Sequence, residues 1–327
     1  MKKFNEIFID KTKYGEKIQT SEYEKQGKHI IVDQGQAEIA GYTNREEGLF
    51  NEVPVIIFGD HTRLIKYIDE PFFLGADGVK VLRSKEKNAN YKYLYYALKS
   101  AKIPNTGYNR HFKWLKDVEI NYPDSVKQEK IVDILDRVSD VIEKRKAELS
   151  YLDTLIKARF VEMFGDTIIN SKGLETKELN EVLVLKAGDF TAASDISVEP
   201  TEINIYPCYG GNGIRGYVAE YNQEGEYSLV GRQGALSGNV QYATGKFKNT
   251  EHALLVKPII RMNSIWLNQL LLNLDLKRYQ TGAAQPGLSV KNLQDIQIIM
   301  VPIDEQRQFA AFVNEIDKSK LQKFSAA

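Results

Sequence analysis

The sequence is poor in features that would place it outside an ordinary soluble setting. It has one cysteine, Cys208, which excludes an internal disulfide framework, and no cysteine–histidine cluster has the spacing of zinc ligands. No run of 18 apolar residues occurs, and the amino-terminal residues "MKKFNEIFIDKTKYGEK" contain no apolar segment typical of a signal peptide. We therefore expect a cytoplasmic protein in a reducing compartment.

Net charge is also missing, because 44 Lys and Arg balance 44 Asp and Glu. Neutrality neither supports nor excludes a nucleic-acid partner. No P-loop is present, and the four histidines pair with neither acids nor Cys208 at any motif spacing. The sequence thus predicts no catalytic residue, no metal site and no cofactor, and we expect Cys208 to be a packing residue.

One glycine pattern does resemble a nucleotide site. Residues 211–216, "GNGIRG", have the G-x-G-x-x-G spacing of a dinucleotide-binding turn. That fingerprint requires a helix directly after it, yet the following residues are rich in Tyr, Val, Gly and Asn and lack helical periodicity. We expect strands and turns here, with the glycines as turn residues.

The chain repeats itself. "DQGQAEIAGYT" (33–43) aligns with "CYGGNGIRGYV" (208–218), and "LKDVEINYPDSVKQEKI" (115–131) aligns with "LQDIQIIMVPIDEQRQF" (293–309). Between these segments Gly59 aligns with Gly231, and Tyr93-Leu94 aligns with Trp266-Leu267. The sequence therefore predicts a tandem duplication with diverged halves.

A long helix is predicted between the copies. Residues 128–164 place apolar residues at alternating steps of four and three, with Arg145 and Arg159 at the remaining seam positions, which is typical of a coiled coil. Pro123 and a capping box of Ser125 with Gln128 mark its start, and Gly165 marks its end.

A second helix of the same kind is expected at 304–327, because Phe309, Val313 and Ile316 align with Ile131, Leu135 and Val138. We expect the two helices to pair antiparallel. The residues predicted to pair the helices are Ile131, Leu135, Val138, Ile142, Leu149, Leu152, Ile156, Phe309, Val313 and Ile316.

The second helix is shorter than the first, so part of the seam is expected to lack cover. We predict that the uncovered part is the distal half, around Leu149 to Met163, and that a second copy of the chain or partner subunits cover it.

This organisation resembles the specificity subunit of Type I restriction-modification systems. The residues that carry the resemblance are the duplicated turns ending in Gly-Tyr, the glycine-flanked "VGRQGALSGNV" with its weaker partner "IFGDHTRL", the loop "TGAAQPGLSVKNLQDIQI", and the Pro-x(3–4)-EQ/QE-x(2)-Ile junction that opens each helix. The resemblance covers essentially the whole chain. It implies an α+β fold of two tandem β-rich target recognition domains joined by long antiparallel coiled-coil helices, with domains at 1–124 and 166–303 and helices at 125–165 and 304–327.

The resemblance also implies a function. Each domain would read one half of a split, asymmetric sequence in double-stranded DNA, while the helices set the gap and dock two methyltransferase subunits, through which a restriction subunit joins. The chain itself would be non-catalytic, and the partner subunits would supply adenine-N6 methyltransferase and ATP-dependent endonuclease activity. In agreement, no N-P-P-F type motif is present. The alternative is a coiled-coil scaffold with duplicated peptide- or protein-binding domains.

DNA recognition needs Arg, Lys, Asn and Gln presented to base edges, with basic and hydroxyl groups on phosphates. Such residues gather in turn-rich stretches of both copies. The predicted DNA-binding residues are Gln36, Thr62, Arg63, Asn109, Arg110, His111 and Lys113 in the first copy, and Asn212, Arg215, Arg232, Gln233, Lys246, Lys248 and Gln285 in the second. Because these loops differ between the copies, the two domains are expected to read different half-sites.

Overall fold

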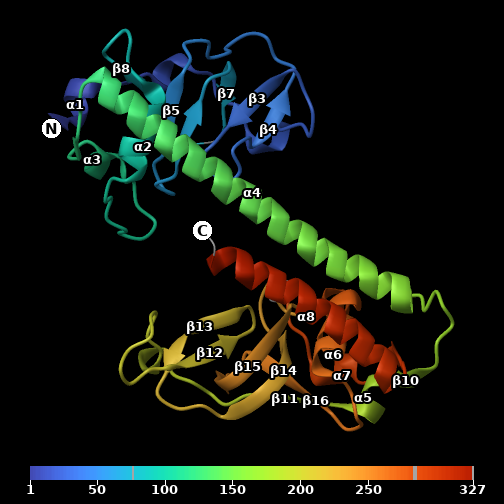
Figure 1. Cartoon of the computed structure of the whole chain (residues 1–327). Coiled ribbons are helices and arrows are strands. Elements are labelled where there is room, and N and C mark those ends of the chain that lie inside the picture. The colour runs from blue at the N-terminus through green and yellow to red at the C-terminus, as the bar shows by residue number, and fades with distance from the viewer. Residues whose placement is uncertain (76, 283–285, 326–327) are drawn as a thin grey trace. The chain divides into compact units, whose positions relative to one another are not determined.

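The computed structural model describes residues 1–75, 77–282 and 286–325, and the chain divides into two compact units, residues 1–144 and 145–327 (Figure 1). Each contains both sheets and helices, so the predicted α+β class is confirmed. We call them unit 1 and unit 2 and describe each by itself.

Unit 1 is built on three small sheets. The strand orders are β2-β8-β5-β6, β4-β3-β7 and β1-β9. Strand β5 is buried at all five positions and pairs antiparallel with both β6 and β8. The strands are β1 (Lys2–Lys3), β2 (Phe8–Asp10), β3 (His29–Val32), β4 (Gly41–Thr43), β5 (Val55–Gly59), β6 (Ile65–Ile68), β7 (Phe72–Leu74), β8 (Val79–Ser84) and β9 (Glu119–Ile120).

The helices of unit 1 pack on one part of this core. Helix α2 places Tyr93, Leu94 and Leu98 in a cluster with Phe4, Phe58 and Leu115, and the start of the long helix α4 adds Ile131. The helices are α1 (Phe4–Ile7), η1 (Thr12–Tyr14), η2 (Thr20–Glu22), α2 (Tyr91–Lys99), α3 (Phe112–Leu115) and α4 (Ser125–Phe164), whose second half belongs to unit 2.

Unit 2 has a six-stranded sheet of order β11-β16-β14-β15-β12-β13 and a two-stranded sheet β10-β17. The strands are β10 (Thr176–Glu178), β11 (Leu183–Ala187), β12 (Tyr206–Gly210), β13 (Gly213–Val218), β14 (Gln223–Gly231), β15 (Val240–Asn249), β16 (Ala253–Pro258) and β17 (Gln297–Ile299). The helices are α5 (Leu179–Val182), η3 (Ala193–Asp195), α6 (Ser264–Asn273), η4 (Leu276–Tyr279), α7 (Val290–Leu293) and α8 (Ile303–Ser325).

The two units repeat the same order of elements at their edges. In both, a short strand and a four-residue helix come first (β1-α1 and β10-α5), and a longer helix, a four-residue helix, a short strand and a long helix come last (α2-α3-β9-α4 and α6-α7-β17-α8). Aligned residues occupy equivalent places: Gly59 and Gly231 end β5 and β14, and Tyr93 and Trp266 lie on α2 and α6. The structure thus agrees with the duplication inferred from the sequence.

The glycine pattern at 211–216 lies in a hairpin. Residues 211 and 212 form the turn between β12 and β13, and β14 follows rather than a helix. The interpretation as turn residues is confirmed for Gly211, which lies in the turn, and for Gly213, which closes it, whereas Gly216 lies inside β13. Gly213 has a φ of 98°, a conformation that favours glycine.

A buried glutamine lies in the first turn of each long helix and bonds to the chain just before the helix. Gln128 donates from Nε2 to the carbonyl oxygen of Pro123 (2.9 Å), and Gln306 donates to that of Val301 (2.7 Å). The N-terminal cap of α4 differs from the prediction, because Asp124 rather than Ser125 accepts the hydrogen bond from the amide of Lys127 (3.0 Å). The helix starts at Ser125, so Ser125 is its first helical residue and the cap is the residue before it, Asp124. Gly165 follows the last turn with a φ of 78°, as expected of a helix end.

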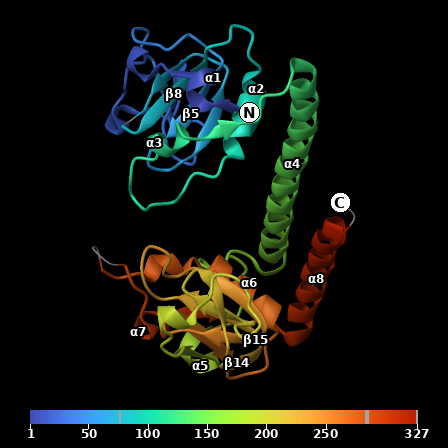
Figure 2. The ribbon, with the colours of Figure 1, turned by 90° about the vertical axis from the view of Figure 1, so that its left-hand side faces the viewer.

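Within unit 2, α8 lies antiparallel to the second half of α4 (Figures 1 and 2). Phe309 near the start of α8 packs against Phe160 and Phe164, whereas Lys320 further along pairs with Asp153 (2.8 Å). Ile156 and Val313 are buried in the same cluster, and Ile316 packs against it. The predicted antiparallel pairing is therefore present here.

The expectation that the distal half of α4 lacks cover is wrong. Ile156 is buried in one cluster with Phe309 and Val313 of α8, and Met163 packs against it, while Leu149 and Leu152 are half-buried. The physical reason is direction: an antiparallel helix that starts beside the end of α4 covers that end first. Exposed apolar residues occur in both halves of α4: Val138 and Ile142 are 48% and 47% exposed in the first half, and Tyr151 and Leu155 are 75% and 46% exposed in the second. The pairing of Val138 and Ile142 with the second helix stays a prediction.

Candidate nucleic-acid interface

In unit 1, a buried aspartate joins two of the loops that carry predicted contacts. Asp60 follows β5, and its carboxylate accepts a hydrogen bond from the amide of Phe112 (2.7 Å). Its carbonyl oxygen accepts from the amide of His111 (2.7 Å), and Nδ1 of the His111 ring lies 3.0 Å from the same oxygen. The loop that ends at His111 is thereby fixed beside the turn 60–63.

Gln34 joins the other loops at this edge. Its Oε1 accepts from the amide of His61 (3.1 Å), its Nε2 donates to the carbonyl of Asp77 (2.9 Å), and its own carbonyl accepts from the hydroxyl of Thr62 (2.7 Å). Four segments, around residues 34–37, 60–63, 77–78 and 105–111, therefore converge. We call this convergence the unit 1 loop cluster.

A buried lysine supports the first of these segments. Lys66 Nζ donates to the carbonyl oxygens of Asp33 (2.8 Å) and Ala37 (2.5 Å), which flank Gln36. Burial lowers the pKa of Lys66, and the nearby Asp33 carboxylate opposes that shift. Its role is to hold the loop, because its donors point to backbone rather than to solvent.

The predicted contacts of unit 1 divide into two kinds. Gln36, Arg110 and Lys113 are exposed, and half-buried Arg63 reaches the carbonyl of Ile103 (3.4 Å) from a backbone with a φ of 62°. His111 is fully buried, so in this structure it offers no surface to a ligand. Thr62 and Asn109 bond to the loops themselves.

In unit 2 the equivalent loops meet at glycine residues. A Cβ placed on Gly231 would lie 2.3 Å from the carbonyl oxygen of Gly211, so the hairpin turn and the end of β14 touch backbone to backbone. The amide of Arg232 donates to the carbonyl of His252 (3.1 Å), and Nδ2 of Asn239 donates to Oδ1 of Asn212 (2.9 Å). We call this convergence the unit 2 loop cluster.

The side chain of Gln233 is exposed in this cluster, and His252 holds its amide group in place. Its Oε1 lies 2.8 Å from Nδ1 of His252, whose Nε2 lies 3.1 Å from a carboxylate oxygen of Glu251. Arg232 reaches the carbonyl of Glu251 (3.4 Å) and is half-buried. The arrangement presents amide and guanidinium groups, which are the groups suited to base edges.

The other predicted residues of unit 2 lie apart from these contacts. Lys246 stands over the ring of Tyr221 (4.9 Å), and Lys248 pairs with Asp189 (3.6 Å). Arg215 is exposed and packs its stem near Gly210. Gln285 lies outside the described residues.

Sequence reasoning missed the residues that hold the loops. Gln34, Asp60 and His252 each organise a cluster, yet none belongs to a motif. A weak signal for Asp60 was available, because it follows the glycine aligned with Gly231 and precedes His61, Thr62 and Arg63.

In the described ranges there is no group of three His, Cys, Asp or Glu side chains that could hold a metal ion, nor is any helix there long and apolar enough to cross a membrane. Cys208 is fully buried, and burial raises the pKa of its thiol, which keeps it unreactive.

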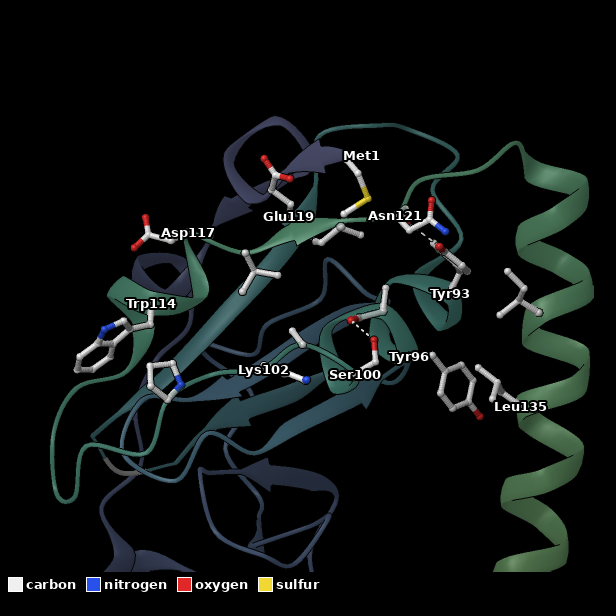
Figure 3. Close-up of a pocket in the computed structure, with 16 residues that line it drawn as sticks. Met1, Tyr93, Tyr96, Ser100, Lys102, Trp114, Asp117, Glu119, Asn121 and Leu135 are labelled. Carbon is white, nitrogen blue, oxygen red and sulfur yellow. Dashed lines mark hydrogen bonds between the residues drawn. The ribbon is translucent and has the colours of Figure 1, made fainter.

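A pocket of about 720 Å³ lies in unit 1 between α2, the segment before β9 and the start of α4 (Figure 3). Its lining is largely apolar and includes Tyr93, Tyr96, Trp114, Ile131 and Leu135. None of the predicted DNA-binding residues lines it. Two predicted helix-pairing residues do, so the pocket belongs to the packing of α4 rather than to a loop cluster.

Comparison with known protein families identifies the family of the chain. The chain belongs to the Type I restriction modification DNA specificity domain family, which it matches twice, over residues 1–151 and 171–324. The two matches fall on the two copies of the duplication.

Among curated relatives, it is similar to the specificity subunit of the Type I restriction enzyme EcoprrI of Escherichia coli, with 38% identity over 194 residues, 58% of this chain and 48% of that protein. It is 29% identical over 157 residues to a putative Type I restriction enzyme specificity subunit of Haemophilus influenzae, covering 47% of this chain and 40% of that protein. The matched region thus spans less than half the length of these two relatives.

A solved structure similar to this chain supports the same fold. A Type I restriction-modification S subunit from M. genitalium superposes with a TM-score of 0.59 at 19% identity, over 99% of this chain and 91% of that chain.

Proposed function

We propose that the chain is the DNA sequence-specificity subunit of a Type I restriction-modification complex. The observation that carries the proposal is that both family matches contain a loop cluster built on equivalent strand ends but displaying different side chains. Unit 1 reads one half of a split, asymmetric site in double-stranded DNA, and unit 2 reads the other.

The contacts we assign are predicted residues whose side chains are exposed or half-buried. Gln36, Arg63, Arg110 and Lys113 serve the first half-site, and Asn212, Arg215, Arg232 and Gln233 serve the second. Lys246 and Lys248 act on phosphates further along the duplex. Phosphate contacts set the register, whereas amide and guanidinium groups read the base edges.

The partners supply the chemistry. Two methyltransferase subunits carry adenine-N6 methylation and dock along the helices, and a motor-nuclease subunit joins through them. The exposed apolar residues on the first half of α4, Ile134, Val138, Val141 and Ile142, offer a surface for that docking. The 40-residue helix α4 acts as the spacer between the half-sites.

Mapping of methylated adenines tests this proposal. In cells that carry the chain with its methyltransferase partner, methylation falls on a split, non-palindromic site with any bases in the gap. Inserting four residues near Glu148 lengthens the helix by roughly 6 Å, and the gap grows by one or two base pairs while both half-sites remain the same. A palindromic site, or methylation that does not depend on the chain, contradicts the proposal.

A further inference from the structure

The loop 105–111 of unit 1 carries an aromatic side chain that the predicted contacts do not explain. Tyr108 is 89% exposed, the largest exposed fraction of any large apolar or aromatic residue in the described ranges. Its ring stacks on the ring of His61, with centroids 4.8 Å apart and planes inclined by 9°. One face of Tyr108 therefore has a partner, and the other face is free.

The stacked pair is held from both sides. The His61 amide donates to Gln34, which the unit 1 loop cluster fixes in place. On the Tyr108 side, the amide of Asn109 donates to the carbonyl of Gly107 (2.9 Å), and the loop returns to the core at buried His111, which bonds to Asp60. Gly107 has a φ of 77°, so the turn needs glycine. Holding a ring in advance lowers the entropy lost when it binds.

The surroundings of the pair are polar and contain basic side chains together with the exposed carboxylate of Asp77, which pairs with Lys17 (2.5 Å). Exposed Arg110 follows two residues later in the same loop, and Gln36 and Arg63 belong to segments that Gln34 and Asp60 tie to it. A single exposed tyrosine needs no explanation by itself. A clamped ring with one free face among basic and amide groups has the composition of a surface that stacks on nucleic-acid bases.

The pair has no counterpart in the second copy. The residue aligned with Tyr108 is Ala283, and the residue aligned with His61 is Gln233. Any role of the stacked rings therefore concerns one half of the molecule.

We infer that Tyr108 inserts its free face against a base of the first half-site and partly unstacks one base step there, with His61 as its backing. This inference rests on the proposed function. Aromatic and apolar wedges unstack and kink duplex DNA in this way, and a stacked base contributes enough binding free energy to be measured by alanine substitution.

The test uses the chain assembled with its methyltransferase partner and a duplex that contains the mapped site. 2-Aminopurine, whose fluorescence is quenched by stacking, replaces one base at a time in each half-site. With the wild-type complex, fluorescence rises at one step of the first half-site. Tyr108→Ala abolishes that rise and weakens binding about 10- to 100-fold, whereas Tyr108→Trp keeps both.

Two variants act as controls. Tyr14→Ala removes another exposed tyrosine of unit 1, whose ring lies beneath Lys11 and Lys13, and leaves fluorescence and affinity unchanged. His61→Ala weakens the rise because Tyr108 loses its backing. Thermal unfolding of Tyr108→Ala matches the wild type, since the side chain is exposed.

The outcomes separate this inference from the proposed function. If Tyr108→Ala binds as tightly as the wild type, or binds more weakly with the fluorescence rise intact, the inference is overturned while the proposed function stands. If the wild-type complex recognises no split site, the proposed function fails first.

Discussion

The same groove is filled in unit 2 and open in unit 1. In unit 2, Phe160 and Phe164 from the second half of α4 pack against Trp266 of α6 and Phe309 of α8. The aligned positions in unit 1 are Tyr93 of α2 and Ile131 of α4, and these two line the 720 Å³ pocket. Equivalent walls thus surround packed phenylalanines in one copy and free space in the other.

The difference shows that a duplicated scaffold distributes its stability unevenly. Burial of a phenylalanine contributes both transfer free energy and packing, neither of which an open pocket provides. The sequence has two tryptophans, Trp114 at the pocket of unit 1 and Trp266 in the groove of unit 2, so a Trp→Phe change in one unit leaves a fluorescence probe of the other.

The largest effect is expected from the filled groove. Phe164→Ala removes a side chain that is 1% exposed, and it lowers the free energy of unfolding of unit 2 by about 3–5 kcal/mol. Urea unfolding followed by Trp266 measures this change. The matched variant Leu135→Ala lies on the same helix but at the open pocket. It lowers the free energy of unfolding of unit 1 by less than about 1.5 kcal/mol, as followed by the fluorescence of Trp114. Equal costs would refute the comparison.

The junction glutamines give the next effect. Gln306 accepts from the amide of Asn263 (2.9 Å) in addition to its bond to Val301, so Gln306→Ala removes the partner of one buried and one half-buried backbone group. We expect a loss of about 1–3 kcal/mol in unit 2. Gln128→Ala lowers the free energy of unfolding of unit 1 by less. The Tyr122 hydroxyl, which also bonds to Gln128, keeps its hydrogen bond to Glu86 (2.6 Å) in this variant. A larger loss for Gln128→Ala in the same urea titrations would reverse the expected order.

A substitution that fills the pocket tests the comparison from the other side. Ala97 lines the pocket, and the aligned residue in unit 2 is the fully buried Leu270. Ala97→Leu adds apolar surface to free space and raises the free energy of unfolding of unit 1 by about 1 kcal/mol, with no change in unit 2. Destabilisation would mean that the pocket walls cannot accept the larger side chain.

The smallest effect concerns the ion pair that ties α4 to α2 in unit 1. Asp136 accepts from Lys92 Nζ (2.6 Å) and from the Tyr96 hydroxyl (2.7 Å), and these bonds, Lys92 first, lower the pKa of Asp136 below 3.8. A lowered carboxyl pKa stabilises the fold above 3.8, and the contribution is lost as the pH falls through the folded value. Because both partners are partly exposed, Asp136→Asn costs under about 1 kcal/mol at pH 7.

Its pH dependence provides the control. The difference in melting temperature between Asp136→Asn and the wild type shrinks as the pH falls below 3.8, and it also shrinks with added salt. A difference that stays constant across this range would show that the carboxylate does not contribute through its charge.

Much of the fold could be predicted from the sequence because it follows periodicity. The seam from Ile131 to Ile156 predicts α4, and its alignment with Phe309 and Val313 predicts α8. Which half of α4 is covered did not follow, because coverage depends on the point at which an antiparallel partner begins. Phe160 and Phe164, which are buried in the unit 2 core, were not among the predicted seam residues.

The candidate site was only partly predictable. Arg232 and Gln233 could be selected as candidates because glycines flank them in the sequence, and their contact with DNA stays a prediction. Gln34 and Asp60 could not, because a residue that ties loops together by hydrogen bonds to backbone needs no particular neighbour in the sequence. The burial of His111 could not be predicted for the same reason, because its place is set by hydrogen bonds to Asp60.

The division of α4 between two cores has a consequence for chimaeras that exchange one specificity for another. A graft of the second copy that begins after the helix, at residue 166, leaves Phe160 and Phe164 behind and joins Trp266 and Phe309 to whatever side chains the recipient helix offers. A crossover in the middle of α4, near Lys144 and Arg145, carries both phenylalanines along with the groove they fill. Modular exchange therefore has its natural joint inside the helix, at a point where no loop marks it.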